Sequence, residues 1–323
     1  MRHRFDDIAT FIQVVETASI SGAARRLNIA KSVVSKRITD LERALGVELL
    51  HRSTRKITPT DKGTVFYERA RTILSELQEA AEQVSDRAGD LVGPLRIAAP
   101  MTFGTMYLGP LLFSFAKRHP RLELSIDLDD AVSDIVGRGY DLAIRIGHLR
   151  DSSMVARKLA TSTRAVCCSP AYAKSVGLPR TVEDLASHIC IGYANVSASL
   201  LWRFQPASPG GKIRSVVVKP RVIVNNGELM RDAAIDGLGL VILPTFIAAE
   251  PLRRGQLVKA LPKDEPLPDT IHAVYPQSRH VPQKVRAVID YLVERLGGVP
   301  PWERSVEEAR PRRAADRKVV ALG

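Results

Sequence analysis

The chain has 323 residues, 45% of them hydrophobic, which is enough for two or three domains with buried cores. No run approaches the roughly 18 consecutive apolar residues of a membrane span, and residues 1–10 lack the apolar core of a secretion signal. These absences predict a cytoplasmic protein without a membrane partner. The net charge of +12 suits a polyanionic partner, and residues 1–63 carry 12 Lys and Arg against 7 Asp and Glu.

Three short helices are predicted within the first 46 residues. In each of them apolar residues recur at the spacing of one helical face: Ile8, Phe11, Ile12 and Val15, then Ile20, Ala23, Ala24 and Leu27, then Val34, Ile38, Leu41 and Leu45. Ser19 stands where the second helix needs an N-cap, and Gly46 tolerates the left-handed turn that ends the third. Residues 28–31 form a short break between them. The pattern predicts a small helical bundle.

The polar side of the third helix is the candidate DNA-reading surface. It carries hydroxyl and cationic side chains, which hydrogen-bond phosphates and base edges, and Val33 beside them suits a thymine methyl. The second helix, rich in Ala and Arg, suits a helix that crosses behind a recognition helix. We expect contact with double-stranded DNA from Lys31, Ser32, Val33, Ser35, Lys36, Arg37 and Thr39.

A β-hairpin wing is predicted next, because two short extended pieces in residues 47–58 flank a basic, polar tip. Arg52, Arg55 and Lys56 would lie along the DNA backbone or enter a narrow minor groove, where the negative potential attracts Arg. Taken alone, these three charges are equally typical of a solvated surface. Beside the helix pattern, the DNA-contacting interpretation is favoured.

The layout is defined by the residues at 11–15, 19–27, 34–38, Leu41-Glu42, Leu45-Gly46, 52–55 and 58–63. As a set they resemble the LysR-type transcription regulators, and the wing and much of the second half resemble the CrgA-like branch. The resemblance extends to about Leu296, and it implies that Ser35 and Lys36 sit on the DNA face. Two departures, Ile20 for the usual Phe and Lys31-Ser32 for the commoner Gln-Pro, prevent any transfer of base preference.

A long linker helix follows the wing. The run Thr58-Pro59-Thr60-Asp61 predicts its start, with Thr58 as the cap and Pro59 at the first helical position. Apolar residues then step alternately by four and three, which is typical of a coiled-coil seam: Phe66, Ala70, Ile73, Leu77, Ala80 and Val84. We expect Phe66, Ile73, Leu77 and Val84 to dimerise the protein, as the resemblance also implies, in a homodimer or homotetramer. The alternative is packing against the chain's own second half. Residues 89–94 are predicted to form a hinge.

From Leu95 strands and helices alternate, which predicts sheets covered by helices on both faces. The resemblance implies two lobes similar to a periplasmic solute-binding protein, with lobe I at about 93–162 and 268–297 and lobe II at about 163–267. The expected strands are 95–99, 122–128, 141–146, 165–168, 216–224, 240–243 and 271–275. The expected helices are 108–117, 133–137, 181–187, 228–236, 245–254 and 285–296.

Ligands of open α/β sheets bind where loops follow the carboxyl ends of the strands, and a small-molecule effector is expected there. Thr102 is the leading candidate, with Asn226 facing it, although a cap or turn is an equal alternative for each. Arg145 could clamp an anion, but pairing with Asp141 or Asp134 is favoured. Tyr193 and Trp202 would line the wall of the effector cleft, and an ordinary core or surface role is an equal alternative. The full predicted set is Thr102, Phe103, Arg145, Ile146, Gly147, Tyr193, Trp202, Asn226 and Gly227.

Neither a catalytic constellation nor a metal or cofactor motif is recognisable. The odd number of cysteines argues against a disulfide scaffold, and buried thiols are favoured over a redox sensor at Cys167, Cys168 and Cys190. Residues 299–323 are basic and predict a disordered or weakly helical tail, with extra DNA contact as the lesser alternative.

The sequence therefore predicts an α+β multidomain regulator. Its parts are a winged helix-turn-helix DNA-binding domain (1–63), a dimerising linker helix (64–89), a two-lobed α/β effector domain (90–298) and the tail. The expected function is transcription regulation, modulated by an effector through DNA binding or bending. Two alternatives remain: a solute-binding protein with a helical dimerisation head, and an enzyme fused to a DNA-binding module.

Overall fold

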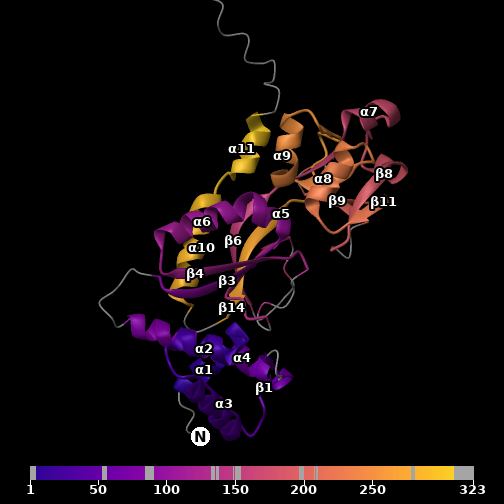
Figure 1. Ribbon diagram of the computed structural model, residues 1–323. Coiled ribbons are helices and arrows are strands. Elements are labelled where there is room, and N and C mark those ends of the chain that lie inside the picture. The colour runs from indigo at the N-terminus through magenta and orange to yellow at the C-terminus, as the bar shows by residue number, and fades with distance from the viewer. Residues whose placement is uncertain are drawn as a thin grey trace, which may run out of the picture. The chain divides into compact units, whose positions relative to one another are not determined.

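The computed structural model describes residues 5–52, 57–83, 91–131, 135, 138–147, 149, 154–195, 200–206, 208, 210–277 and 281–308. The chain divides into two compact units, coloured along the sequence in Figure 1. The first comprises Met1–Leu91 with Asp134–Gly139, and the second comprises Val92–Ser133 with Tyr140–Gly323. No helix in the described part of the chain is long and apolar enough to cross a membrane.

The first unit is a three-helix bundle followed by a two-stranded hairpin and a long helix. Its elements are α1 (Phe5–Thr17), α2 (Ile20–Leu27), α3 (Lys31–Leu45), β1 (Leu50–Arg52), β2 (Ile57–Pro59) and α4 (Asp61–Gln83). The strands pair antiparallel, so the predicted wing is confirmed as a hairpin. Residues 53–56 at its tip, which include Arg55 and Lys56, lie outside the described residues.

Local capping and apolar spacing explain the bundle. The Ser19 hydroxyl accepts a hydrogen bond from the Gly22 N–H at 3.1 Å, which confirms the predicted cap of α2. Gly46 adopts φ +69° at the end of α3, a conformation that costs glycine little. The predicted stripes meet in one core, formed by Phe11, Ile12, Val14, Ala23, Ala24, Val34, Ile38, Leu41, Leu49, Leu50 and Ala70.

The start of the linker helix was predicted two residues too early. Thr58 and Pro59 pair with His51 and Leu50 in the hairpin, so they belong to β2. Thr60 is the cap instead, because its hydroxyl accepts from the Gly63 N–H at 2.9 Å, and α4 begins at Asp61. The hairpin register takes precedence here over a locally plausible Thr-Pro helix start.

Lobe I of the second unit is built on a five-stranded sheet in the order β4-β3-β5-β14-β6. β3 (Gly93–Ala99) is parallel to β4 (Leu122–Leu128) and β5 (Leu142–Ile146), whereas β14 (Asp269–Pro276) runs antiparallel to β5 and to β6 (Met154–Ser162). Helices α6 (Gly109–Arg118) and α10 (Gln283–Leu296) lie together against this sheet (Figure 1). Strand β6 was not predicted. Of the expected helix at 133–137, only Ile135 is among the described residues.

The chain enters helix directly after β3, earlier than expected. α5 (Met101–Phe103) is followed by a π-helical segment, η1 (Gly104–Leu108), and then by α6. Thr102 and Phe103 therefore occupy the first helical turn after the strand and not a loop. π-helical turns are rare and are often found at functional sites.

The described part of lobe II contains three small sheets. β7 (Arg164–Cys168) lies between β12 (Val241–Pro244) and β13 (Val258–Lys259), β8 (Ile189–Tyr193) pairs with β11 (Lys219–Val224), and β9 (Leu201–Phe204) pairs with β10 (Arg214–Val217). A bridge between Cys190 and Leu240 joins β8 to β12. The single strand expected at 216–224 is wrong, because Val218 is buried between β10 and β11, which belong to different sheets. The helices are α7 (Pro170–Val176), η2 (Glu183–Ser187), α8 (Gly227–Ile235) and α9 (Thr245–Arg253).

The tail was expected to be disordered or weakly helical, and its first part is helical and packed against the rest of the chain. Residues Pro301–Glu308 form helix α11, which packs on α9 (Figure 1). Trp302 is only 1% exposed, and burial of so large an apolar side chain holds the helix in place. Residues 309–323, which carry most of the tail's basic residues, lie outside the described residues.

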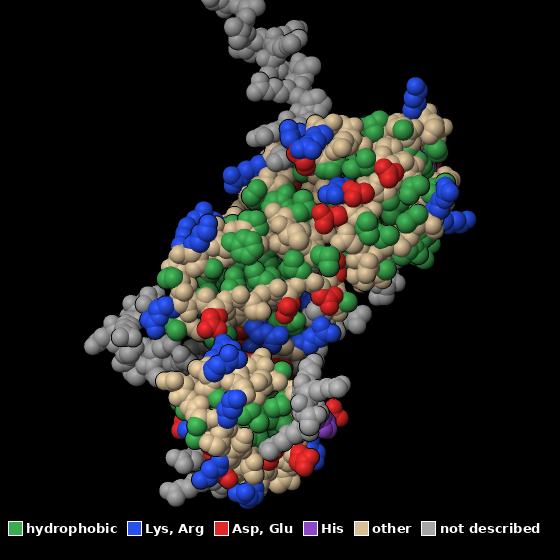
Figure 2. Space-filling view, viewed as in Figure 1, with side chains coloured by type: hydrophobic (Ala, Val, Ile, Leu, Met, Phe, Trp, Pro, Cys, Tyr) green, Lys and Arg blue, Asp and Glu red, His purple; other side chains and the backbone are tan. Residues whose placement is uncertain are grey.

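Hydrophobic side chains also reach the surface of the second unit (Figure 2). Phe113 on α6, Ile223 on β11 and Leu229 on α8 are each more than half exposed. Exposed apolar side chains that gather on one face are typical of surfaces that bind another protein.

Candidate DNA-binding surface and candidate effector site

Helix α3 has two sharply different sides. Val34, Ile38 and Leu41 are at most 1% exposed and pack into the bundle core. Lys31, Ser32, Val33 and Lys36 are exposed, whereas Ser35 and Thr39 are partly buried at the edge of this polar face. The helix thus presents cations, a hydroxyl and a small apolar side chain away from the core, a set that suits phosphates and base edges.

Arg37 does not belong to this face. Its guanidinium donates to the Thr10 hydroxyl at 3.2 Å and to the Asp6 carboxylate at 3.1 Å, and it lies 3.9 Å from a carboxylate oxygen of Asp7. The Arg37 side chain is only 28% exposed. The prediction that Arg37 contacts DNA is therefore corrected, because Arg37 ties α3 to α1. The pairing joins residues up to 31 positions apart, which helical periodicity does not reveal.

Glu42 connects the wing to α3, a role that the sequence prediction missed. One carboxylate oxygen of Glu42 accepts from the Leu49 N–H at 2.9 Å and from the Leu50 N–H at 3.2 Å. Behind this strand, a side chain at Gly63 would collide with the Leu49 carbonyl oxygen, so only glycine lets α4 approach this closely. These contacts fix the base of the wing, including Arg52 at the end of β1, relative to the recognition helix.

The predicted dimer seam is divided in two by the structure. Phe66 packs against Phe11, with ring centroids 5.6 Å apart, and Ala70 is 5% exposed, so both serve the chain's own bundle. We therefore remove Phe66 from the predicted dimer contacts. Ile73 and Leu77 are 58% and 48% exposed. Val84, also predicted for the seam, lies outside the described residues.

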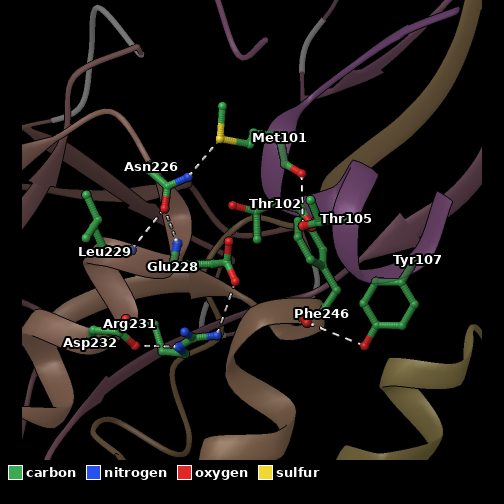
Figure 3. A network of polar contacts seen from close by, with 10 residues as sticks. All are labelled: Met101, Thr102, Thr105, Tyr107, Asn226, Glu228, Leu229, Arg231, Asp232 and Phe246. Carbon is green, nitrogen blue, oxygen red and sulfur yellow. Dashed lines mark hydrogen bonds and ion pairs between the residues drawn. The ribbon is translucent and has the colours of Figure 1, made fainter. Parts of the chain in front are cut away.

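Thr102 of lobe I faces the first turn of α8 in lobe II (Figure 3). A Cβ at Gly227 would lie 3.4 Å from the Thr102 hydroxyl oxygen and 2.6 Å from the Ile247 side chain, so only glycine allows this approach. Thr102 is 5% exposed, and its buried hydroxyl has no hydrogen-bond partner in the described part of the chain. Such a group is costly unless something else satisfies it.

Asn226 closes the opposite side of this junction as the N-cap of α8. Its side-chain oxygen accepts from the Glu228 N–H at 2.9 Å and the Leu229 N–H at 3.0 Å. Its amide nitrogen points at the Met101 sulfur, 3.6 Å away (Figure 3). The capping alternative considered for Asn226 is therefore present, and its amide nitrogen still faces lobe I.

Tyr193 and Asp130 form a second link between the lobes. Asp130 accepts from the Met101 N–H at 2.9 Å and hydrogen-bonds Tyr193. Burial raises the pKa of both groups, that of Tyr193 to about 12. Asp130 was not predicted, although its position directly after β4, at the same sheet edge as Thr102, is a pattern that could have indicated it.

The remaining effector candidates lie in different surroundings. Burial lowers the pKa of Arg145, opposed by the charge of Asp129, and one of its buried terminal nitrogens has no hydrogen-bond partner among the described residues. No ion pair between Arg145 and Asp141 is found among the described residues, and one oxygen of Asp141 accepts from the Arg96 N–H at 2.7 Å. Asp134, the other candidate partner, lies outside the described residues. After Arg145, Ile146 is half-buried and Gly147 turns the chain at φ +104°.

Two predicted effector residues are core residues instead. Trp202 is 3% exposed in the core of lobe II, and Phe103 is fully buried in an aromatic cluster. An apolar side chain at a strand or helix position gives no sequence sign of which side faces a ligand. Both are therefore corrected to structural roles.

The three cysteines are free and buried, as predicted. Burial raises the pKa of all three thiols, to about 11 for Cys168 and about 12 for Cys190. A raised pKa disfavours the reactive thiolate, which argues against redox sensing. Within the described residues, no group of three His, Cys, Asp or Glu side chains is arranged to hold a metal ion.

Two family models match the chain. Residues 5–64 match the bacterial regulatory helix-turn-helix of the LysR family, and residues 88–297 match the LysR substrate binding domain. The chain belongs to the LysR family of transcriptional regulators. The helix-turn-helix match leaves the solute-binding alternative unsupported.

Sequence similarity to relatives of this LysR-type regulator extends over nearly the whole chain. PtxR of Pseudomonas aeruginosa is 35% identical over 292 residues, 90% of this chain and 92% of PtxR. CrgA of Neisseria meningitidis is 32% identical over 300 residues, 92% of this chain and 98% of CrgA. The predicted resemblance to the CrgA-like branch is confirmed.

Solved structures agree with the fold of this LysR-type regulator. The CrgA structure matches with a TM-score of 0.57 and 30% identity, over 92% of this chain and 100% of CrgA. Full-length AphB, the virulence activator of Vibrio cholerae, matches with a TM-score of 0.56 and 28% identity, over 90% of this chain and 99% of AphB. LysR-type regulators bind DNA and small-molecule effectors and oligomerise.

Proposed function

We propose that this regulator reads double-stranded DNA with the exposed face of α3 and the wing, and that a small molecule at the Thr102–Asn226 junction modulates DNA binding or bending. In this proposal residues 1–63 bind DNA, residues 64–89 dimerise the chain, and residues from 90 onward form the effector domain. Helix α11 extends that domain beyond its expected end at 298.

The observation that carries the proposal is the two-sidedness of α3. Its apolar stripe is taken up by the bundle core, so its polar face is available to a major groove. Lys31 and Lys36 supply positive charge, and Ser32 and Val33 supply a hydrogen-bonding group and a methyl surface. Ser35 and Thr39 stay candidate contacts at the edge of the face.

Lys36→Ala tests this face, with Lys174→Ala as the charge-matched control. Lys174 is an exposed cation on α7 of lobe II, so its loss changes the net charge equally without touching α3. Fluorescence anisotropy on the DNA upstream of the regulator's own gene, over a salt series, should show weaker binding for Lys36→Ala only. Equal losses for both variants would reduce the α3 contact to a general charge effect.

Arg52, Arg55 and Lys56 are proposed phosphate contacts of the wing. Arg55→Ala should weaken binding to specific and random duplexes alike, and should reduce the salt slope by about 0.9, the value for one phosphate. An unchanged affinity and slope would remove the wing from the proposal.

The effector site is proposed on the unpartnered Thr102 hydroxyl. This hydroxyl and the Asn226 amide both face the junction, and they suit a ligand with hydrogen-bonding atoms. Tyr193, Gly227 and the half-buried Arg145 with Ile146 and Gly147 are further proposed contacts, with Arg145 suited to an anionic group.

Thr102→Val tests the effector role. It replaces the unpartnered hydroxyl by a methyl of similar shape, so we expect unchanged or higher stability and an unchanged affinity for DNA without effector. A thermal-shift screen of small organic acids and alcohols on the wild type would supply hits. Calorimetry of a hit should show lost binding to Thr102→Val, and an unchanged affinity would exclude Thr102 as a contact.

Self-association is proposed through the exposed part of the α4 seam. Ile73 and Leu77 leave a strip of apolar surface that a second copy of the helix would cover. Sedimentation of the full chain distinguishes homodimer from homotetramer. Ile73→Asp should shift it towards monomer, whereas an unchanged assembly would place dimerisation elsewhere.

A further inference from the structure

Helix α11 lies beyond the matched family domain, which ends at residue 297, yet it is part of the second unit and packs on α9. It follows α10 after a short connection, and it contacts α9 of lobe II along its length (Figure 1). Two of its side chains, Trp302 and Glu303, contact three separate parts of the effector domain.

The Trp302 ring completes an aromatic cluster shared by both lobes. Its centroid lies 4.7 Å from Tyr107 and 5.8 Å from Phe103 of lobe I, and 6.0 Å from Phe246 of lobe II, all in edge-on arrangements. The Tyr107 hydroxyl also donates to the Phe246 carbonyl oxygen at 3.5 Å (Figure 3). Such ring pairs are directional, so they resist sliding of one lobe past the other.

Glu303 binds one of the two points where the chain crosses between the lobes. Thr163 lies between β6 of lobe I and β7 of lobe II, and its N–H donates to the Glu303 carboxylate at 2.8 Å. The Thr163 hydroxyl donates to the same carboxylate at 2.8 Å. The hydroxyl of Thr245, at the start of α9, donates to it at 2.6 Å. One carboxylate thereby joins the crossing strand to a lobe II helix.

The contacts of α11 reach Phe103, the residue next to the proposed effector contact Thr102. Phe103, which carries the Trp302 contact, follows Thr102 in the same helical turn, and the π-helical segment Gly104–Leu108 carries Tyr107. A change in the position of Trp302 would therefore move the turn that holds Thr102. Glu303 would at the same time hold the crossing at Thr163 in place.

We propose that α11 is a C-terminal clamp that fixes the angle between the two lobes, with Trp302 and Glu303 as positioning residues for the turn that contains Thr102. The clamp acts on the effector domain whether or not Thr102 binds an effector. Its test needs no effector, so its failure and that of the proposed effector site are distinguishable.

The test measures the distance between the lobes in the full-length protein. Nitroxide labels are attached at Lys117→Cys on α6 and Lys174→Cys on α7, both exposed positions, while the buried native thiols stay unlabelled. Pulsed electron resonance gives the distance distribution, and singly labelled proteins identify distances between copies. The wild type should give one narrow interlobe distance.

Trp302→Ala should broaden or shift that distance, and Trp302→Phe, which keeps a ring, should largely restore it. Trp202 is then the only tryptophan, so its emission reports whether lobe II is folded. A chain ending at Glu308 keeps α11 and should match the wild type, whereas a chain ending at Gly298 should match Trp302→Ala. An unchanged distance in folded Trp302→Ala overturns the proposal.

Glu303 gives an independent test should Trp302→Ala not fold. Glu303→Gln keeps an acceptor oxygen for Thr163 and should retain the narrow distance. Glu303→Ala has no acceptor oxygen for Thr163 and should broaden the distance distribution. A distribution in Glu303→Ala equal to that of the wild type overturns the clamp.

Discussion

Glu42 offers a quantitative test of how the wing is held against the recognition helix. Glu42→Ala removes the oxygen that accepts from the Leu49 and Leu50 N–H groups, at positions only 1% and 4% exposed. Each buried donor left without a partner costs about 1–3 kcal/mol, so we expect the two donors together to cost about 2–6 kcal/mol. Glu42→Gln keeps a neutral acceptor, which is roughly half as strong, and should lose about half as much.

Hydrogen exchange of the full chain is the assay, because it reports opening of this segment alone. Both tryptophans lie in the second unit, so tryptophan fluorescence cannot detect the loss and serves as the internal control. In Glu42→Ala, exchange of the Leu49 and Leu50 amides should accelerate about 30- to 20,000-fold, by the conversion of 1.4 kcal/mol per tenfold. The tryptophan transition should not move. Unchanged protection, or equal effects of Ala and Gln, would refute this account of the wing.

Three further predictions concern residues whose role the structure changes or specifies. Arg37→Ala should lower stability by up to about 1 kcal/mol, as for a partly exposed ion pair. It should weaken DNA binding, measured by fluorescence anisotropy, less than Lys36→Ala does. Equal losses of DNA affinity in the two variants would return Arg37 to the DNA face. Asn226→Ala should lower stability by about 1 kcal/mol through the lost cap, whereas Asn226→Asp should not, and tryptophan-monitored urea unfolding distinguishes them. Because burial raises the pKa of all three thiols, alkylation by iodoacetamide at pH 8 should be very slow in the native protein and should reach three thiols after denaturation; rapid native labelling would contradict their burial.

Much of the first unit was predictable because its determinants are local. The apolar spacing in α1, α2 and α3, the Ser19 cap and the Gly46 turn act within a few residues, so they are legible in a single sequence. The same is true of the alternation in β4 and the stripe of α10. The start of α4 was misplaced because pairing of β2 with β1 prevailed over a local helix-start pattern.

The candidate effector site was only partly predictable. The rule that ligands gather beyond strand ends indicated Thr102 and Asn226, whose elements do meet. It did not separate Trp202 and Phe103, which face the core, from residues that face the junction. Side-chain direction at these positions is set by packing against residues distant in the chain.

The sequence by itself determined the helix-turn-helix, the polar face of α3, the wing and the alternating architecture of the effector domain, because periodicity and capping are short-range effects. Only the tertiary structure decided that Arg37 pairs with Asp6, that Phe66 serves its own bundle and that Trp302 joins Phe103 and Phe246. Partners in these contacts lie from 31 to 199 residues apart, and the energy of such contacts exists only once the folded chain brings them together.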